Sequence, residues 1–396
     1  MVLPAKVSAS SSTRVINMKV NNLLSGMIIG SLALAVAGCG SEHKTNNNLV
    51  KPFDYQALLN TAAEGEIPGV VLYIESPQLY FYGAAGIADL NDKTPMLIDA
   101  RIPNGSAGKK LTALLAAMLV EQQKLNLDQS ITNYLPAEIT NRVANASSMT
   151  TRQMLQHTAG LFDYLNDSNG AFYDAVIAEP ESIKTDAFAL QFALDQKAKF
   201  APAQGWSYSN TGYILTGLVL DQVLGTHHSQ AMRMQIFEPW GLSSLSYGGL
   251  EKSYGPIVPG YFHSGNDVLD TRQYYQNIGV ADAPVVGNAK DMANILKFIV
   301  EGKQFSHSIH QLLMSETSFV STGLGTLSYS YGLFKETING KQVIHHGGRE
   351  LGYATYNFYI PDTKTTVAML FNCNGYKACD DAHDALYQKV IGELTK

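Results

Sequence analysis

The chain has 396 residues, of which 45% are hydrophobic and 16% charged, so it is long enough and apolar enough to bury a large core. This composition excludes a disordered chain. The formal net charge is -6 and the sequence contains no block of lysine or arginine, so nucleic acid is not expected as a partner.

The amino terminus has the pattern of an export signal. The apolar run that follows Met18-Lys19-Val20 spans about 15 residues, from Leu23 to Ala37, and is therefore shorter than the roughly 20 needed for a membrane-spanning helix. Its small residues lead directly to Cys39, which resembles the lipobox of bacterial lipoproteins. The resemblance implies cleavage before Cys39 and acylation of its thiol. The alternative is an ordinary signal peptide with a chance cysteine.

These features divide the amino-terminal part of the chain. We expect residues 1–38 to be a lipoprotein signal peptide and residues 39–52, which include the polar stretch SEHKTNNN, to be a tether. The residue after the cysteine is Gly40 rather than an aspartate, which resembles the pattern of lipoproteins sorted to the outer membrane in Gram-negative cells. The expected location is therefore the periplasmic face of the outer membrane, with the membrane contacted through the lipid anchor at Cys39.

The pattern after the tether begins with a helix and two strands. Residues 53–64 have helical spacing, and the apolar runs PGVVLYIES and LYFYGAAGIADL predict a β-hairpin. A helix follows from Ser106 to about Gln123. Short helices and loops are predicted from about 125 to 285, in TTRQMLQHTAGL, TDAFALQFALDQ and NTGYILTGLVLDQVLG.

The carboxyl third returns to strands. They are predicted in YSYGLFKET, KQVIHH, GYATYNFYIP and TKTTVAMLFN, before a helix over about 380–394. Strands at both ends predict an α+β fold with a discontinuous antiparallel sheet flanked by helices. The sheet domain is expected to comprise residues 53–124 and 286–396, with residues 125–285 as an inserted, mainly helical domain.

The stretch NGSAGKK, just before an apolar helix, contains a serine followed three residues later by a lysine. On a helix Ser106 and Lys109 would lie on one face, with the hydroxyl and the amine in reach of each other. A serine hydroxyl needs a base or a nearby positive charge to act as a nucleophile. In the alternative interpretation Ser106 is only a helix cap. The pattern alone is weak, because Ser41-Glu42-His43-Lys44 in the tether also fits it.

Two further clusters follow in order. They are Tyr208-Ser209-Asn210, preceded by PAQGW, and His346-Gly347-Gly348, followed by Gly352-Tyr353 six positions after the histidine. With the serine and lysine motif, this order resembles the serine β-lactamase and penicillin-binding family. The similarity is to the branch with class C β-lactamases, D-alanyl-D-alanine carboxypeptidases and esterases, and it spans about residue 53 to the end. It implies a β-lactamase / DD-peptidase-like fold.

Shorter matches compete with these motifs. Tyr164-Leu165-Asn166 and Tyr275-Gln276-Asn277 fit the second motif but lack its flanks. His263-Ser264-Gly265 fits the third motif but falls in the helical insert, where no following strand is expected.

The resemblance implies a role for each matched residue. Ser106 would form an acyl-enzyme, and Tyr208, its phenolate favoured by the charge of Lys109, would act as base and acid. In the alternative that the sequence leaves open, Lys109 shares the role of base with Tyr208. Asn210 would bind the substrate amide and Lys109.

The third motif would supply the rest of the substrate site. His346 would orient the substrate carboxylate and the Tyr208 hydroxyl. The backbone amides of Ser106 and Arg349 would hold the oxyanion. Gly347 and Gly348, without side chains, would let the substrate approach the strand.

The remaining candidates are weaker. Cys373 and Cys379 are expected either to pair as a disulfide in an oxidising compartment or to be two buried thiols. His227-His228 has no spaced third ligand in the sequence and is expected at the surface. We expect no metal and no cofactor.

These observations predict a cell-envelope serine hydrolase. The first hypothesis is a D-alanyl-D-alanine carboxypeptidase or peptidase acting on peptidoglycan peptides, because a histidine replaces lysine in the third motif. The second is a β-lactamase or esterase with the same site, and the third is a non-catalytic penicillin-binding scaffold. The expected partner is a small molecule or peptide: a D-alanyl peptide, a β-lactam or an ester.

Overall fold

The computed structural model describes residues 53–264 and 267–396. The expected signal peptide, Cys39 and the tether lie outside these ranges, so their roles stay predictions. Within the two described ranges, no helix has both the length and the apolar character that crossing a bilayer requires.

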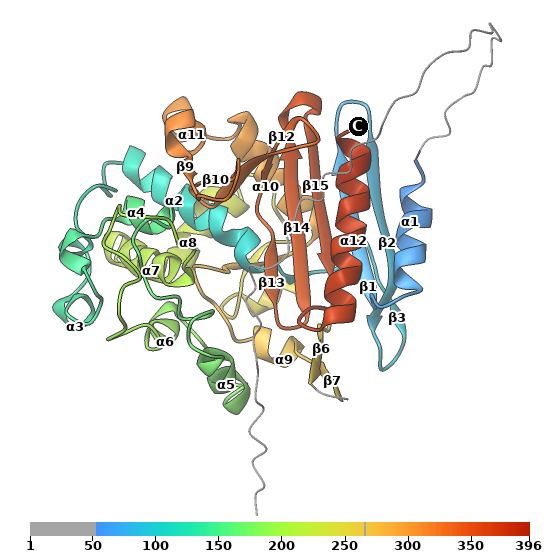
Figure 1. The fold of residues 1–396 in the computed structure, drawn as a ribbon. Coiled ribbons are helices and arrows are strands. Elements are labelled where there is room, and N and C mark those ends of the chain that lie inside the picture. Colours follow the sequence, from blue (N-terminus) through green and yellow to red (C-terminus); the bar gives the residue numbers. More distant parts are fainter. Residues whose placement is uncertain (1–52, 265–266) are drawn as a thin grey trace, which may run out of the picture.

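A ten-stranded antiparallel sheet forms the centre of the fold (Figure 1). Its strands are β1 Gly69–Glu75, β2 Tyr80–Asp89, β3 Thr94–Pro95, β9 Val320–Ser321, β10 Ser328–Ser330, β11 Leu333–Ile338, β12 Lys341–His345, β13 Gly348–Glu350, β14 Tyr353–Ile360 and β15 Thr365–Phe371. The spatial order is β3-β2-β1-β15-β14-β12-β11-β10-β9, and β13 pairs with β14. Strand β1 meets β15 with Val70 opposite Phe371. The predicted discontinuous antiparallel sheet is therefore confirmed.

The helices precede, separate and follow these strands. They are α1 Tyr55–Ala63, α2 Lys109–Glu121, α3 Ala137–Thr140, α4 Thr151–Leu155, α5 Ala171–Ala178, α6 Asp186–Leu190, α7 Asn210–Leu224, α8 His228–Met232, α9 Arg272–Tyr275, α10 Ala289–Glu301, α11 His307–Met314 and α12 Lys377–Leu394. Short strands lie among them, namely β4 Ile102–Pro103, β5 Ser246–Tyr247, β6 Tyr261–Ser264, β7 Asp267–Asp270 and β8 Val285–Gly287. The middle of the chain is mainly helical, as Figure 1 shows.

Helices cover both faces of the sheet, which explains why β1 and β15 are buried along almost their whole length. Successive residues of a strand point to opposite faces. Val70 and Leu72 of β1 therefore pack in the cluster that includes residues of α1 and α12, while Val71 and Tyr73 join the larger cluster that includes α2 and α10. Figure 1 shows α12 and α1 on one side of the sheet and the helical region on the other.

Helix α2 runs through the interior and carries the lysine of the first motif. All its residues from Lys109 to Leu119 are buried. A helix that is mostly apolar on every side is expected to be enclosed by other elements. Its first turn is therefore fixed by packing, which holds the residues just before it in a defined place.

Three predicted elements differ from the structure. YSYGLFKET forms two strands, β10 and β11, because Gly332 turns the chain with φ +79° against the backbone of Lys110. The last helix begins at Lys377 rather than near 380. The expectation that no strand follows His263 is wrong, since β6 and β7 pair as a short hairpin.

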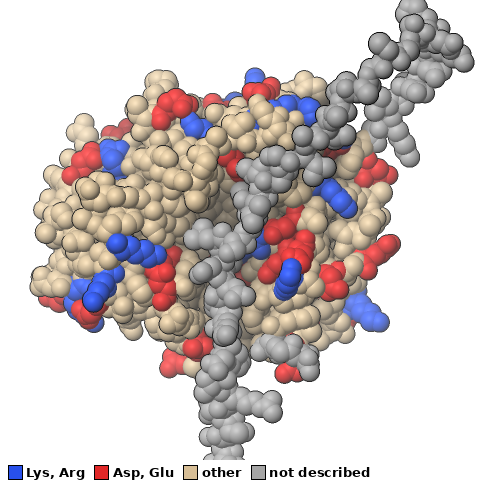
Figure 2. Space-filling view, in the orientation of Figure 1, with Lys and Arg blue, Asp and Glu red and all other residues tan. Residues whose placement is uncertain are grey.

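Basic and acidic side chains are interspersed on the face drawn in Figure 2. This face of the described residues therefore presents no continuous basic surface to a polyanion.

Candidate active site

Ser106 lies in a 3-10 turn, Gly105–Gly108, immediately before α2. Gly108, not Ser106, occupies the N-cap position of α2, so the interpretation of Ser106 as a helix cap does not hold. The turn is anchored by Asn104, whose fully buried amide donates to the carbonyls of Ile102, at 3.0 Å, and Gly287, at 3.2 Å. Within the described residues no side chain caps α2 through a hydrogen bond, so the Ser106 hydroxyl is not used as a helix cap.

Lys109 contacts Ser106 directly. Its Nζ donates to Ser106 Oγ at 3.0 Å, to Asn210 Oδ1 at 2.7 Å and to the backbone carbonyl of Asp282 at 2.8 Å. The side chain is fully buried. Burial lowers the pKa of Lys109, and the Asp282 carboxylate, 3.7 Å away, is the largest effect opposing this. The lowered pKa increases the fraction of neutral amine, which is the form that accepts a proton.

Asn210 begins α7 and joins Lys109 to a buried acid. Its Oδ1 accepts from Lys109, and its Nδ2 donates to the carboxylate of Asp163 at 3.1 Å. Asp163 is 1% exposed. The amide is therefore held from both ends, because its Nδ2 also lies 3.2 Å from the second carboxylate oxygen of Asp163.

Asp282 is a second buried acid beside Lys109. Burial raises the pKa of Asp282 to about 6, and the charge of Lys109 opposes that rise. Its carboxylate also accepts a hydrogen bond from Tyr164 at 3.2 Å. Neither Asp163 nor Asp282 belongs to a recognisable motif, and sequence reasoning missed both because each comes from a segment far from Lys109 in the chain.

Tyr208 comes from the loop before α7 and lies beside the serine and the lysine. Its ring centre is 5.2 Å from Lys109 Nζ, and its phenol lies near enough to Ser106 for that hydroxyl to affect its pKa. Burial raises the pKa of Tyr208 well above its usual value, and the nearby Ser106 hydroxyl is the largest effect that opposes the rise. The expectation that Lys109 would favour the phenolate is therefore wrong for the unliganded site, because desolvation dominates.

His346 follows β12 at the edge of the site and is buried. Its ring centre is 6.1 Å from that of Tyr208. Burial lowers the pKa of His346 well below its usual value, and the charge of Lys109 lowers it further. Nδ1 lies 2.7 Å from the carbonyl of Gly347, so in the neutral ring Nδ1 carries the proton and Nε2 is an acceptor. Such a ring is suited to accept a hydrogen bond from a hydroxyl and is poorly suited to bind a carboxylate.

Strand β13 lies directly against the turn of Ser106. A Cβ added to Gly348 would stand 2.1 Å from the carbonyl oxygen of Asn104 and 3.0 Å from the amide nitrogen of Ser106. The glycine therefore allows the approach of the two segments. The backbone nitrogen of Arg349 also lies near the turn, 3.2 Å from where a Cβ of Gly105 would be.

The Arg349 side chain points away from the serine. Its guanidinium donates to Asp384 on α12 at 2.7 Å and to Tyr356 at 3.0 Å. This follows from strand alternation, because Arg349 and Gly348 face opposite sides of the sheet. Only the backbone of Arg349 is therefore placed to take part in the site.

An aromatic cluster supports Tyr208 from behind. The ring of His157 lies 4.2 Å from that of Tyr208 and 4.5 Å from that of Tyr329, centre to centre, and Trp206 lies next to both His157 and Tyr329. His157 Nδ1 accepts the backbone N–H of Ser209 at 3.3 Å. Burial lowers the pKa of His157 well below its usual value. The neutral ring therefore helps to fix the chain on either side of Tyr208.

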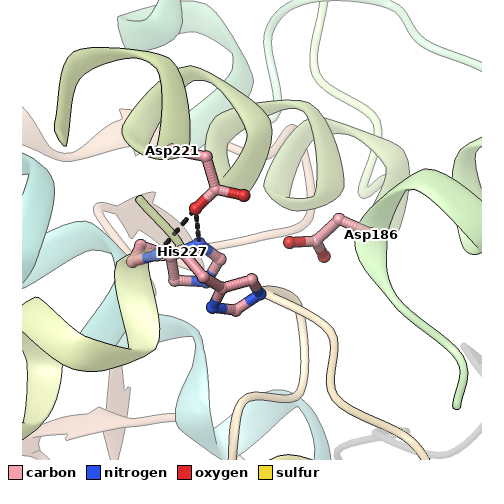
Figure 3. A group of neighbouring side chains, drawn as sticks. Asp186, Asp221 and His227 are labelled. Carbon is pink, nitrogen blue, oxygen red and sulfur yellow. Dashed lines mark hydrogen bonds and ion pairs between the residues drawn. The ribbon is translucent and has the colours of Figure 1, made fainter. Parts of the chain in front are cut away.

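His227 and His228 lie far from Ser106 in sequence, in a cluster with Asp186 and Asp221 (Figure 3). His228 is fully buried rather than at the surface, which corrects the sequence expectation. Its Nδ1 bonds Asp221 at 2.7 Å and its Nε2 bonds Tyr247 at 2.7 Å. Asp221 also accepts the backbone N–H of His228 at 2.7 Å. These bonds fix the start of α8 against α7 and give the cluster a structural role.

Cys373 and Cys379 are joined by a disulfide. Both are fully buried and pack against Tyr261. Of the two alternatives from the sequence, the structure has the paired one. The bond closes the loop between β15 and α12.

The chain was compared with known proteins. A family model described as Beta-lactamase matches residues 50–390. The chain is similar to Penicillin-binding protein 4* of Bacillus subtilis, with 26% identity over 336 residues that cover 80% of this chain and 71% of that protein. It is also similar to a D-aminopeptidase of Cereibacter sphaeroides, with 25% identity over 312 residues that cover 77% of this chain and 56% of that protein. The chain thus spans just over half the length of the D-aminopeptidase.

Solved structures resemble the fold. One is the D-amino acid amidase of Ochrobactrum anthropi SV3 complexed with L-phenylalanine, which superimposes with a TM-score of 0.70. The match covers 85% of this chain and 98% of the amidase at 20% identity, so it is evidence of a shared fold alone.

Proposed function

Because this chain belongs to the β-lactamase family of serine hydrolases, we propose that Ser106 is its nucleophile and that it hydrolyses amides or esters through an acyl-enzyme. The observation that carries the proposal is the 3.0 Å hydrogen bond between Ser106 Oγ and a fully buried lysine whose pKa is lowered. A helix cap or a surface lysine would require neither the burial nor the contact.

Acylation is proposed to begin with proton transfer from Ser106 to neutral Lys109. Ser106 Oγ attacks the substrate carbonyl carbon, and the carbonyl oxygen becomes an oxyanion that the backbone amides of Ser106 and Arg349 bind. Tyr208, a neutral phenol at rest, then donates its proton to the leaving nitrogen or oxygen as the bond to it breaks. Lys109 returns its proton to Tyr208. His346 Nε2 would accept a hydrogen bond from the Tyr208 hydroxyl and so orient it for proton transfer.

Deacylation uses the same groups in reverse. Water enters where the leaving group departed and gives a proton to the neutral Lys109 amine as its oxygen attacks the ester of Ser106; Lys109 then passes that proton to Oγ. The C–Oγ bond breaks, Oγ regains a proton, and the free acid leaves. Ser106 is thereby restored without any other reactant.

For the substrate, we favour a short amino-acid or peptide acyl group in amide or ester linkage. A D-alanyl-D-alanine carboxypeptidase has to bind a terminal carboxylate, which calls for an available cation. Three basic groups near the site are engaged otherwise: Lys109 by three acceptors, Arg349 by Asp384, and His346 by loss of its charge. The carboxypeptidase activity on peptidoglycan peptides is therefore the second candidate, supported by the similarity to Penicillin-binding protein 4*.

For the location, we propose a cell-envelope protein held by a lipid on Cys39. The lipobox-like stretch before Cys39 supports this. Replacement of Cys39 by Ser, followed by fractionation and metabolic labelling with a fatty acid, tests it. Label that persists in the variant would refute it.

The catalytic proposal is tested with two substrates and one variant. Purified protein is given nitrophenyl butyrate and, separately, a diacetylated lysine-D-Ala-D-Ala peptide. We expect ester turnover that Ser106→Ala loses, and release of D-alanine would favour the second candidate. Turnover that is equal in wild type and Ser106→Ala would refute the role of Ser106.

A further inference from the structure

Strand β13 carries an acidic residue on the side of the nucleophile. Gly348 and Glu350 are two apart on the strand, so their side-chain directions lie on one face, opposite to Arg349. Gly348 faces Ser106, as the predicted clash of a Cβ there shows. The Cγ of Glu350 lies 3.2 Å from where a Cβ of Gly105, the residue before Ser106, would be.

The carboxylate of Glu350 is held by two tyrosines from different helices. Tyr173 of α5 donates to Oε2 at 3.0 Å, and Tyr275 of α9 donates to the same oxygen at 2.9 Å. Tyr275 in turn accepts the backbone N–H of Leu351 at 2.7 Å. Among the described residues no donor bonds Oε1, and Glu350 is partly exposed. One oxygen is therefore fixed and the other is left for a ligand.

The charges around Glu350 favour a cationic ligand. Lys109 is the ammonium nearest the nucleophile, and it is already paired with Asp282 and, through Asn210, with Asp163. Desolvation raises the pKa of Glu350 to about 7, and Asp282 is the next cause of the rise. A carboxylate that is costly to ionise in the empty site is stabilised when a positive charge binds beside it.

We propose that Glu350 is an ammonium-binding subsite, so that the preferred acyl donor is an amino-acid amide, ester or peptide with a free, protonated amino group next to the scissile carbonyl. The inference rests on the proposed function of Ser106 and names its substrate class. The chain would then act as an aminopeptidase or amino-acid amidase rather than on acyl groups with a blocked amine.

The dimensions fit a short amine. A strand advances about 3.3 Å per residue, so Glu350 stands about 7 Å along the strand from Gly348. The nitrogen of an α-amino group lies about 2.5 Å from its carbonyl carbon. A charge-assisted hydrogen bond adds about 2.8 Å. The last two distances together come to about 5 Å, so one amino acid places its amine within the range of the carboxylate. An acylated amine would instead present a neutral N–H and additional bulk to the carboxylate.

Glu350 would act on the binding and position of the substrate, so the test compares two substrates that differ only in whether the amino group is free and charged or acetylated and neutral. The substrates are D-alanine p-nitroanilide, with a free amine, and N-acetyl-D-alanine p-nitroanilide, without one. We expect kcat/KM of the wild type to be at least tenfold higher for the free amine. In Glu350→Gln we expect that preference to fall at least tenfold, with KM for the free amine showing the larger change.

Two further variants guard the interpretation. Glu350→Asp keeps the charge but withdraws it by one methylene, and we expect an intermediate preference; thermal melting checks that both variants are folded. Glu316→Gln is the matched control, because Glu316 is 85% exposed and, among the described residues, its carboxylate pairs with Lys335 alone. We expect it to change neither rate.

The outcomes separate the inference from the function on which it rests. Ser106-dependent turnover with the same substrate preference in wild type and Glu350→Gln would overturn the subsite and leave the nucleophile intact. An equal loss on both substrates would indicate a purely structural role for Glu350 and would also overturn it. Turnover that survives Ser106→Ala would overturn the proposed function, and the subsite with it.

Discussion

Gly348→Ala should impair catalysis more than it impairs folding. The new Cβ would stand 2.1 Å from the carbonyl oxygen of Asn104, whereas ordinary van der Waals contact begins at 3.4 Å, so strand and turn must separate by about 1.3 Å. That movement widens the gap between the amides of Ser106 and Arg349 that are proposed to bind the oxyanion. A displacement of about 1 Å in such a site costs about a hundredfold in rate.

Gly347→Ala is the matched control. Neither Gly347 nor Gly348 has a positive φ, and a Cβ at 347 would meet one atom, the carbonyl oxygen of Thr355, at 2.9 Å. The assay is kcat/KM on nitrophenyl butyrate, with thermal melting in parallel. We expect a loss of about a hundredfold in Gly348→Ala and less than tenfold in Gly347→Ala, with both proteins folded. A folded Gly348→Ala protein with wild-type kcat/KM would refute the placement of the oxyanion beside β13.

Three other predictions concern the proton path, pH and the disulfide. Lys109→Ala and Tyr208→Phe should each slow labelling by a fluorescent penicillin by about 10² to 10⁴, the usual contribution of a general acid or base; a near-normal labelling rate in either would mean that the path is misassigned. The pKa of Glu350 is about 7 in the folded protein and near 4.5 in the unfolded chain. Its contribution to the free energy of unfolding is therefore fully present below pH 4.5. This contribution, at most about 3 kcal/mol, is lost as the pH rises through 7. Between pH 4.5 and 7.5 the melting temperature of the wild type should therefore fall relative to that of Glu350→Gln, and parallel curves would contradict this. Reduction of Cys373–Cys379 should lower the free energy of unfolding by about 2 kcal/mol, the entropy of closing so short a loop, as measured by denaturant titration with and without reductant; no change would mean that the bond contributes nothing to stability.

Much of the site could be predicted from the sequence because its polar residues lie in short motifs. The spacing of Ser106 and Lys109 is set by one helical turn, and Tyr208 and Asn210 stand two residues apart at the start of α7. Local geometry therefore carries information about which side chains meet. His346 was placed by the glycine and aromatic residue that follow it, and the structure brings it to the same edge as Tyr208.

The remaining parts depend on contacts between distant segments. Asp163 and Asp282 reach Lys109 from separate loops, and Glu350 is positioned by tyrosines from two further helices, so no spacing in the sequence indicates them. The pKa of Tyr208 was predicted in the wrong direction for a related reason. Sequence shows which charge is near the phenol but not how far burial removes it from water.

The fold shows the same division. Apolar runs predict β1, β14 and β15 because strands covered on both faces are continuously hydrophobic. The split between β10 and β11 was missed because it depends on Gly332, which must turn where the backbone of Lys110 leaves no room for a side chain.

The most direct test of the central claim is the mass of a trapped acyl-enzyme. The protein is incubated with a penicillin, quenched with acid, digested and mapped by mass spectrometry. The account predicts one added penicillin on the peptide that contains Ser106, and no adduct in Ser106→Ala. An adduct on another residue, or one that persists in the alanine variant, would contradict it.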